Sequence, residues 1–292
     1  MIKFIVSDMD GTLLGRNNDI PEENLKAIRK AEEIGVQFVI ASGRMYEDIK
    51  PFLDRYNLKC ECIVLNGAEY RDKDGNILEG IYMDQGKLKD ILEIIKRNGL
   101  NVEIYTDRGL YTINTKEESL KGSLLRVQYF NPEVTNHEEI LKRAKEEHHF
   151  PILKYIDNID EFLSKDIKIG KIESYGECED KIFKLKEELK TIDGLAISSS
   201  IAINLEINHI EAQKGTILSK ISDKKRVKKE EVVVIGDGFN DYSMFTEFPI
   251  SFAMENAIPE IKEIAKYITD ANYNSGVAKA VYKILKLKDI HL

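Results

Sequence analysis

The sequence has few cysteines, no long apolar run and no excess of basic residues, and each absence excludes a class of protein. Three cysteines in 292 residues are an odd number for a long chain, which favours a reducing, cytoplasmic setting over an oxidised exterior. Cys60 and Cys62 would make a poor zinc site, because neither a second cysteine pair nor a nearby histidine completes four ligands. We therefore expect structural thiols.

Membranes and nucleic acids are not expected as partners. No apolar stretch reaches the ~18 residues of a membrane-spanning helix, and the apolar run over residues 1–6 is too short for a signal peptide. The 43 Lys and Arg against 51 Asp and Glu give a net charge of −8, which argues against broad binding to nucleic acid or anionic lipid. A small anionic substrate is still allowed, because a metal or local donors can reverse the sign inside one cleft.

The length and composition predict an ordinary globular protein of about two domains. Apolar residues make up 42% of the chain and charged residues 32%, which is typical of a folded, globular protein and not of a disordered one. No pattern in the sequence predicts an oligomeric state.

The N-terminal part alternates strands and helices. Apolar, β-branched runs predict buried strands at 2–6, 36–41 and 62–65. A helix opened by Pro21 joins the first two strands, and a helix over about 46–56 joins the second to the third. This alternation is typical of a right-handed parallel α/β sheet.

The middle of the chain has a different layout, and we expect a second domain there. A helix over 85–97 precedes a hairpin formed by 102–105 and 110–113. The consecutive strands predict an antiparallel sheet with helices on one face. Further elements are expected as helices at about 138–147 and 179–190 and as strands at 152–155, 169–174, 195–199 and 201–207.

The last segment returns to the alternating pattern. A helix begins near Lys214, and Val232 to Ile235 form a β-branched run typical of a strand buried on both faces. A strand at 250–253 and helices at 259–267 and 275–285 complete the chain.

Carboxylates follow two of the predicted parallel strands. Asp8 and Asp10 follow the first strand, and Asp237 and Asp241 follow the strand over 232–235. Ligands bind at this edge of open α/β sheets, and four converging carboxylates would repel one another unless a cation lay among them. Oxygen ligands favour Mg²⁺ over zinc or copper. The alternative, that these aspartates only cap helices, weakens once both clusters are considered together.

Other residues in these loops are suited to a phosphate group. Gly11-Thr12 and Gly43 allow close approach of backbone N–H groups, and Ser42 supplies a hydroxyl at the end of the second strand. Lys214 stands at a helix start, where its charge and the helix dipole both favour an anion. Taken singly, Ser42 is as readily explained as a cap and Lys214 as a surface lysine.

These motifs resemble those of the haloacid dehalogenase (HAD) superfamily. Asp8–Leu14 resembles the first motif of that superfamily, and Ala41–Arg44 resembles the second. The third motif is similar to Lys214–Gly215 and the fourth to Gly236–Asp241. Residues 65–68 (Leu-Asn-Gly-Ala) resemble a segment of the Cof-type subgroup. The resemblance implies a Rossmann-like parallel-sheet core over 1–83 and 210–292, with an inserted α+β cap domain of type C2B over 84–209.

The resemblance also implies roles for the loop residues. Asp8 would attack phosphorus to form an aspartyl-phosphate, and Asp10 would protonate the leaving oxygen and later deprotonate water. Mg²⁺ would be held by the Asp8 carboxylate, the Asp10 backbone carbonyl and Asp237. The remaining assignments are phosphate binding by Gly11, Ser42, Gly43, Lys214 and Asn240, orientation of Lys214 or a metal-bound water by Asp241, and possible substrate contacts by Arg44 and Asn66.

The expected function is Mg²⁺-dependent hydrolysis of a small phosphorylated metabolite, such as a sugar phosphate. The presence of Asp10 favours phosphate esters, because dehalogenases of this superfamily lack that second aspartate. Two alternatives remain open, a phosphomutase of the same superfamily and a non-catalytic metabolite-binding protein. His148 and His149 are expected to be surface residues, because adjacent side chains on a helix cannot easily share a metal.

Overall fold

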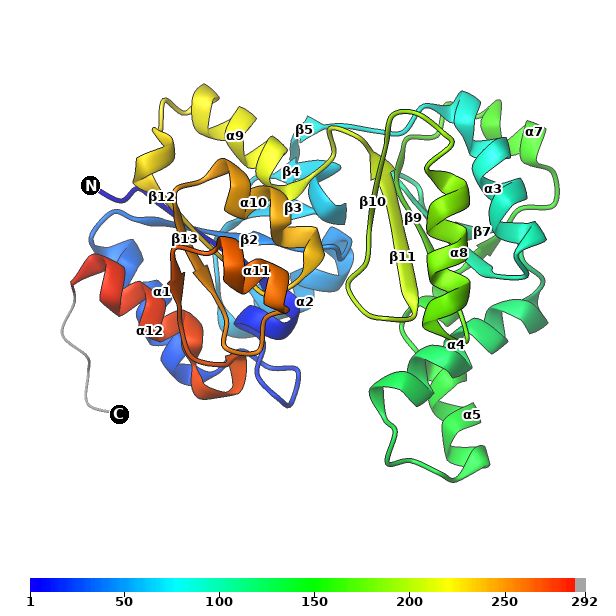
Figure 1. Ribbon diagram of the computed structural model, residues 1–292, viewed down its shortest axis with the longest axis horizontal. Coiled ribbons are helices and arrows are strands. Elements are labelled where there is room, and N and C mark those ends of the chain that lie inside the picture. The colour runs from blue at the N-terminus through cyan, green and yellow to red at the C-terminus, as the bar shows by residue number, and fades with distance from the viewer. Residues whose placement is uncertain (287–292) are drawn as a thin grey trace. The chain divides into compact units, whose positions relative to one another are not determined.

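The computed structural model describes residues 1–286, and the chain divides into two compact units (Figure 1). One unit combines Met1–Ile81 with the chain from Glu211 onward, and the other is Tyr82–Ile210. The boundaries expected from the sequence lie at 83/84 and 209/210, within two residues of these. Each unit is described by itself below.

The first unit, within the described residues, is built on an eight-stranded sheet of order β14-β13-β12-β1-β2-β3-β4-β5. The pairs from β14 to β3 are parallel, and β4 and β5 extend the sheet as an antiparallel hairpin. The strands are β1 (Phe4–Asp8), β2 (Gln37–Ala41), β3 (Glu61–Val64), β4 (Glu69–Arg71), β5 (Ile77–Gly80), β12 (Val232–Gly236), β13 (Ile250–Ala253) and β14 (Tyr267–Ile268).

Four of the helices around this sheet form two packed pairs (Figure 1). Helix α1 packs on α12, and α9 packs on α10. Leu25, Ile28 and Ala31 form the buried stripe of α1, as their spacing of three residues predicts. The helices are α1 (Glu22–Glu33), α2 (Tyr46–Tyr56), α9 (Lys214–Lys224), α10 (Tyr242–Glu247), α11 (Pro259–Ile264) and α12 (Gly276–Leu285).

Strand β1 lies at the centre of the sheet, and its register places three strand ends side by side. Ser7 pairs with Ile235 of β12, and Asp8 pairs with Ala41 of β2. The loops that follow β1, β2 and β12 therefore leave the sheet at the same edge.

Two expected boundaries in this unit are wrong. The first strand runs over Phe4–Asp8 and not 2–6, because pairing on both sides begins at Phe4 and continues through polar but buried Ser7. The helix expected over 259–267 ends at Ile264. Tyr267 and Ile268 instead form β14, which adds to β13 as an edge strand.

The second unit, again within the described residues, contains a six-stranded sheet of order β10-β11-β9-β6-β7-β8. All neighbours are antiparallel except β7 and β8, which agrees with the antiparallel layout expected for the middle of the chain. The strands are β6 (Asn101–Thr106), β7 (Gly109–Thr112), β8 (Lys154–Tyr155), β9 (Ile169–Tyr175), β10 (Leu195–Ser198) and β11 (Asn204–His209).

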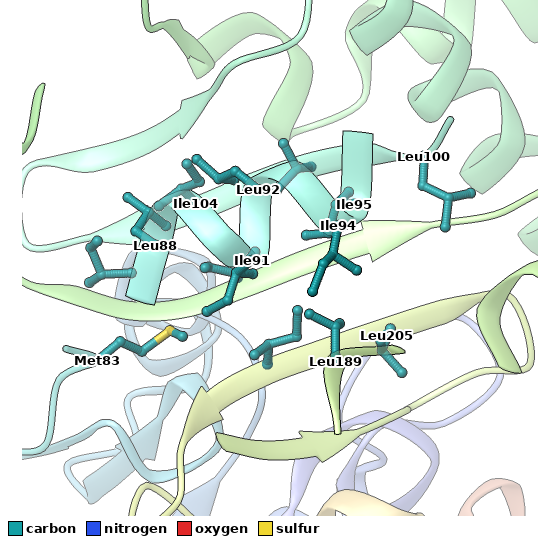
Figure 2. Packing of buried hydrophobic residues seen from close by; sticks show 14 of the residues in the cluster. Met83, Leu88, Ile91, Leu92, Ile94, Ile95, Leu100, Ile104, Leu189 and Leu205 are labelled. Carbon is teal, nitrogen blue, oxygen red and sulfur yellow. The ribbon is translucent and has the colours of Figure 1, made fainter. Parts of the chain in front are cut away.

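One face of this sheet is apolar and the other is polar. Helices α3 (Leu88–Arg97) and α8 (Glu179–Leu189) contribute Ile91 and Leu189 to an apolar cluster with Ile104 and Leu205 of the sheet (Figure 2). The alternate side chains of the strands are polar, and Glu103 of β6, Glu173 of β9 and Glu206 of β11 share one row across the sheet.

The helical segment between β7 and β8 was missed in part by the sequence analysis. Helix α4 (Lys116–Phe130) precedes α5 (His137–Glu146), α6 (His149–Ile152) and β8, and α7 (Ile159–Leu163) follows. Helix α4 buries Ser119, Gly122 and Ser123 on one face, and its apolar row of Leu120, Leu124 and Val127 packs against α5. The apolar pattern is therefore short and interrupted by small and polar residues. The strand expected at 152–155 is reduced to two residues, since α6 extends to Ile152.

The surface placement expected for His149 is wrong. Its side chain is mostly buried, and Nδ1 lies 3.1 Å from Glu103 Oε2. Across residues 1–286, the structure contains no helix long and apolar enough to cross a membrane.

Candidate active site

The candidate site is formed by the loops that follow β1, β2 and β12. Asp8 is the last residue of β1, Ser42 follows β2, and Asp237 follows β12. These three positions are adjacent because their strands are parallel neighbours in the sheet. The expectation that the acidic clusters meet at one sheet edge is confirmed for Asp8, Asp237 and Asp241, but the Asp10 carboxylate lies outside this group.

Lys214 lies between two of the aspartates. It is the first residue of α9, is fully buried, and donates hydrogen bonds of 2.6 Å to Asp8 Oδ1 and to Asp241 Oδ1. The alternative of a surface lysine is therefore wrong. Asp241 Oδ2 accepts the backbone N–H groups of Asp237 and Gly238, at 2.9 Å and 3.1 Å. Asp241 thus combines a loop-capping role with the orientation of Lys214.

Burial and mutual repulsion change the pKa values of these groups. Burial first, and the Asp241 charge second, raise the pKa of Asp8 well above its usual range, although the Lys214 ammonium opposes them. The same two causes raise the pKa of Asp237 to about 7. Burial alone would lower the pKa of Lys214, but the charges of Asp241 and Asp8 outweigh it and raise the pKa. The cluster therefore carries more negative charge than one lysine compensates.

Asp237 is fixed by the loop that follows β1. Thr12 Oγ1 donates a hydrogen bond of 2.6 Å to Asp237 Oδ1, which lowers the Asp237 pKa against the other effects. Gly11 has φ +76°, and a Cβ at this position would lie 2.3 Å from Asp237 Oδ2. Glycine is therefore required here both by the backbone conformation and by the close approach of the carboxylate.

The donor set fits a hard divalent cation. Among the described residues, oxygen atoms of Asp8, Asp237 and Asp241 lie within 4.8 Å of one another. Both oxygens of Asp241 already accept hydrogen bonds. Within residues 1–286, Asp8 and Asp237 each keep one carboxylate oxygen that accepts no hydrogen bond. All-oxygen ligation of this kind suits Mg²⁺.

The Asp10 carboxylate lies outside this group of three aspartates and is bonded by Arg44. Arg44 Nε donates to Asp10 Oδ2 at 2.8 Å, and Nη2 donates to Oδ1 at 2.6 Å. The structure places the guanidinium of Arg44 on the Asp10 carboxylate, and the expected substrate contact of Arg44 stays a prediction. The Asp10 side chain is 54% exposed, so it remains reachable from solvent.

The second loop packs against a strained turn. Ser42 is buried, and its hydroxyl accepts the N–H of Arg44 at 3.2 Å, which is the local capping bond considered from the sequence. Gly43 lies between them. Asn66 lies in the turn after β3 and has φ +59°. Its Oδ1 accepts a hydrogen bond of 3.3 Å from Asn240 Nδ2. The structure therefore brings Asn66 and Asn240 together, 174 residues apart in the chain.

The sequence did not indicate the side-chain contact of Thr12, which was expected only for its backbone, and Asn256 was missed altogether. Thr12 binds Asp237, as described above, and Asn256 Nδ2 donates a hydrogen bond of 2.7 Å to the Gly11 carbonyl. The signal for Thr12 was its place in the Asp-Met-Asp-Gly-Thr run. Nothing in the sequence around Asn256 indicates its contact, which depends on the packing of the segment after β13 against the β1 loop.

Comparison with known proteins is consistent with this arrangement. A family model described as haloacid dehalogenase-like hydrolase matches residues 5–281. "5-Amino-6-(5-phospho-D-ribitylamino)uracil phosphatase YwtE" of Bacillus subtilis is 31% identical over 284 residues, which cover 97% of this chain and 98% of that protein. "Phosphatase YwpJ" of the same organism is 29% identical, over 97% and 100%.

Solved structures agree on the fold. A haloacid dehalogenase-like hydrolase from B. subtilis superimposes with a TM-score of 0.83 at 28% identity, covering 96% of this chain and 99% of that one. The HAD subclass IIB sugar phosphatase BT4131 has a TM-score of 0.75 over 98% of this chain and 100% of that one. Its identity of 19% supports a shared fold alone. The chain belongs to the haloacid dehalogenase-like hydrolase family, as a Cof-type member with an α/β Rossmann-like core and a cap.

Proposed function

We propose that this phosphatase is Mg²⁺-dependent and hydrolyses a small phosphorylated metabolite, such as a sugar phosphate, through an aspartyl-phosphate on Asp8. The observation that carries the proposal is the state of the Asp8 carboxylate. It ends the central strand, one oxygen is fixed by Lys214, and the other accepts no hydrogen bond within residues 1–286. A carboxylate held in this way is prepared to attack phosphorus.

The reaction then has two steps. In the first, Asp8 attacks phosphorus, the bond to the leaving oxygen breaks, and Asp10 gives that oxygen a proton. In the second, water attacks the aspartyl-phosphate and gives its proton to Asp10, and the bond between phosphorus and Asp8 breaks. The electron pair of that bond returns to the Asp8 carboxylate, and inorganic phosphate leaves.

A divalent cation completes the charge balance of the site. Asp8, Asp237 and the backbone carbonyl of Asp10 would hold it, and the ion supplies positive charge that screens Asp8 from the phosphate. Asp241 keeps Lys214 charged and in place. The residues proposed to contact the phosphoryl group are Gly11, Ser42, Gly43, Lys214 and Asn240.

The relatives support a small metabolite as substrate. The name of YwtE gives 5-amino-6-(5-phospho-D-ribitylamino)uracil as the compound on which that enzyme acts. We propose a substrate of comparable size for this chain, with no nucleic acid or membrane partner. A sugar phosphate and the phosphoribityl compound both belong in the first substrate panel.

The test is phosphate release from that panel and from p-nitrophenyl phosphate. Wild type is assayed with Mg²⁺ and with EDTA, and Asp8→Asn is assayed with Mg²⁺. Asp54→Asn is the matched control, because Asp54 is an exposed aspartate whose ion pair with Lys50 lies on helix α2. We expect activity in wild type and in Asp54→Asn, and loss of activity both with EDTA and in Asp8→Asn.

Other outcomes would contradict the proposal. Phosphate release that survives Asp8→Asn would exclude Asp8 as nucleophile. Formation of a phosphate isomer with slow hydrolysis would indicate a phosphomutase. Tight binding of a metabolite without turnover would indicate a binding protein.

A further inference from the structure

Arg44 and Asp10 form a two-point contact between the loops after β2 and β1. The guanidinium donates from Nε to Oδ2 and from Nη2 to Oδ1, at 2.8 Å and 2.6 Å. Two parallel hydrogen bonds of this kind fix the plane of a carboxylate as well as its position. Each carboxylate oxygen keeps a second lone pair, so Asp10 can still exchange a proton.

Arg44 is itself held in place at both ends. Its backbone N–H bonds Ser42 Oγ, and its carbonyl accepts the N–H of Leu65 at 2.9 Å. Its guanidinium lies over the ring of Phe52, 5.5 Å from the centroid, and Nη2 lies 3.4 Å from Asn18 Oδ1. The donor is therefore more restrained than the half-exposed aspartate that it contacts.

Asp10 depends on this one partner. Within residues 1–286, no side chain other than Arg44 donates a hydrogen bond to the Asp10 carboxylate. Without the guanidinium, the carboxylate would be free to rotate in solvent among its side-chain rotamers.

We propose that Arg44 is a positioning residue, which orients the Asp10 carboxylate for proton transfer and does not serve mainly to bind substrate. This inference rests on the proposed function, because it assigns Arg44 a part in the two-step reaction. Arg44 acts through Asp10, so its removal would slow each step to the extent that the step needs Asp10.

p-Nitrophenyl phosphate separates the two steps. Its nitrophenolate leaves without a proton, so aspartyl-phosphate formation does not need Asp10, whereas the attacking water must still lose a proton to Asp10. In Arg44→Ala, kcat/KM reports only the first step and should stay within about threefold of wild type. Misorientation of Asp10 as the base should slow hydrolysis of the aspartyl-phosphate and lower kcat by about 100-fold. Because kcat/KM is nearly unchanged, KM should fall nearly in proportion. One equivalent of nitrophenolate should appear as a burst.

A double-mutant cycle tests whether Arg44 acts through Asp10. Asp10→Ala should lower kcat by at least as much as Arg44→Ala, and the double variant should resemble Asp10→Ala within about threefold. Arg44→Lys restores the charge without the two-point contact, so we expect it to recover kcat by about tenfold over Arg44→Ala. Arg44→Lys also replaces Arg44→Ala as the test variant if Arg44→Ala does not fold.

Arg97→Ala is the matched control. Arg97 also donates from Nε and Nη2 to one carboxylate, in this case both to Glu188 Oε2, and it lies on helix α3 of the other unit. We expect wild-type kcat and KM in this variant. A slowed Arg97→Ala would mean that loss of any such pair lowers the activity, which would overturn the assignment.

Two results would overturn the proposal for Arg44. A raised KM with unchanged kcat would make Arg44 a substrate contact, and losses that multiply in the double variant would show that it acts independently of Asp10. Failure of the proposed function looks different, because Asp8→Asn would then keep its activity. If Asp8→Asn is inactive and the cycle is additive, only the role of Arg44 is wrong.

Discussion

Lys214 Nζ lies 2.6 Å from Asp8 Oδ1, so the proposed nucleophile forms its ion pair with a residue 206 positions away in the chain. The pair is buried, and Asp241 accepts a second hydrogen bond from the same ammonium. The Lys214 charge lowers the pKa of Asp8, although burial and the Asp241 charge outweigh it.

Replacement of this lysine should damage stability and activity together. Lys214→Met leaves two buried carboxylates without their counter-charge, and breaking a buried ion pair destabilises proteins by about 3–5 kcal/mol. The rate of phosphate release should fall about 100-fold or more, because one preorganised charge at the reacting centre is lost. Urea unfolding and steady-state assays of the folded variant measure the two effects.

Lys220→Met is the control for this variant. Lys220 lies on the same helix, and its ion pair with Glu211 is exposed. We expect only small changes in stability and rate, since exposed pairs contribute little. A Lys214→Met variant as active as Lys220→Met would show that Lys214 has no part in the reaction.

The turn after β3 should control the position of Lys214. Gly67 has φ +107°, and a Cβ there would lie 2.6 Å from the backbone of Gln213, the residue before Lys214. Gly67→Ala should therefore lower the free energy of unfolding by about 1–3 kcal/mol and should also reduce kcat by displacing the start of α9.

Gly35→Ala is the control that measures the stability cost of a positive φ without a steric clash. Gly35 has φ +83°, but a Cβ there would meet no atom within 4 Å. It should lose about 1 kcal/mol of stability from its left-handed conformation alone, with unchanged kcat. Equal kcat in the two alanine variants would refute the link between the turn and Lys214.

The threonine in the first loop should tune the cation affinity. The Thr12 hydroxyl lowers the pKa of Asp237, but burial and the Asp241 charge outweigh it and raise that pKa to about 7. Thr12→Val removes this hydrogen bond, so the Asp237 pKa should rise further and protons should compete better with Mg²⁺. The Mg²⁺ concentration for half-maximal activity should increase about tenfold, with a larger effect at pH 6 than at pH 8.

Thr12→Ser is the matched control, because serine keeps the hydroxyl. Its Mg²⁺ requirement should remain near that of wild type at both pH values. If Thr12→Ser and Thr12→Val behave alike, the methyl group and not the hydrogen bond matters at this position.

The meeting of the acidic loops could be predicted because it depends on the order of the strands and not on side-chain detail. The apolar runs before Asp8 and Asp237 identify two buried strands, and parallel strands carry their following loops to one edge. The chain of side-chain contacts could not be predicted in the same way. Arg44 meets Asp10 only because β1 and β2 are neighbours in register.

Helix α4 shows a second limit of sequence analysis. One face buries small residues and Arg126, which pairs with Glu103 and Glu147. Only a short apolar row, Leu120, Leu124 and Val127, packs against α5. Hydrophobic periodicity gives only a weak signal for such a helix. The signal that was present is local, the capping box formed by Thr115 and Glu118.

The polar row of the second sheet should make stability depend on acid pH. Glu173 accepts hydrogen bonds from Lys171, Tyr175 and Asn204, at 2.8 Å, 2.7 Å and 2.8 Å. Burial alone would raise its pKa, but the Lys171 charge and these donors outweigh burial and lower the pKa from 4.5 to about 2.

Because the folded-state pKa is the lower one, the stabilisation by Glu173 is fully present above pH 4.5 and is lost as the pH falls toward 2. Glu173→Gln cannot lose a charge, so its free energy of unfolding should be lower at pH 7 and should decline less between pH 4.5 and 2. Urea unfolding at several pH values measures both slopes. Glu139→Gln, which removes an exposed partner of Arg143, should retain nearly the wild-type curve. Parallel curves for wild type and Glu173→Gln over that range would show that folding does not lower the pKa of Glu173.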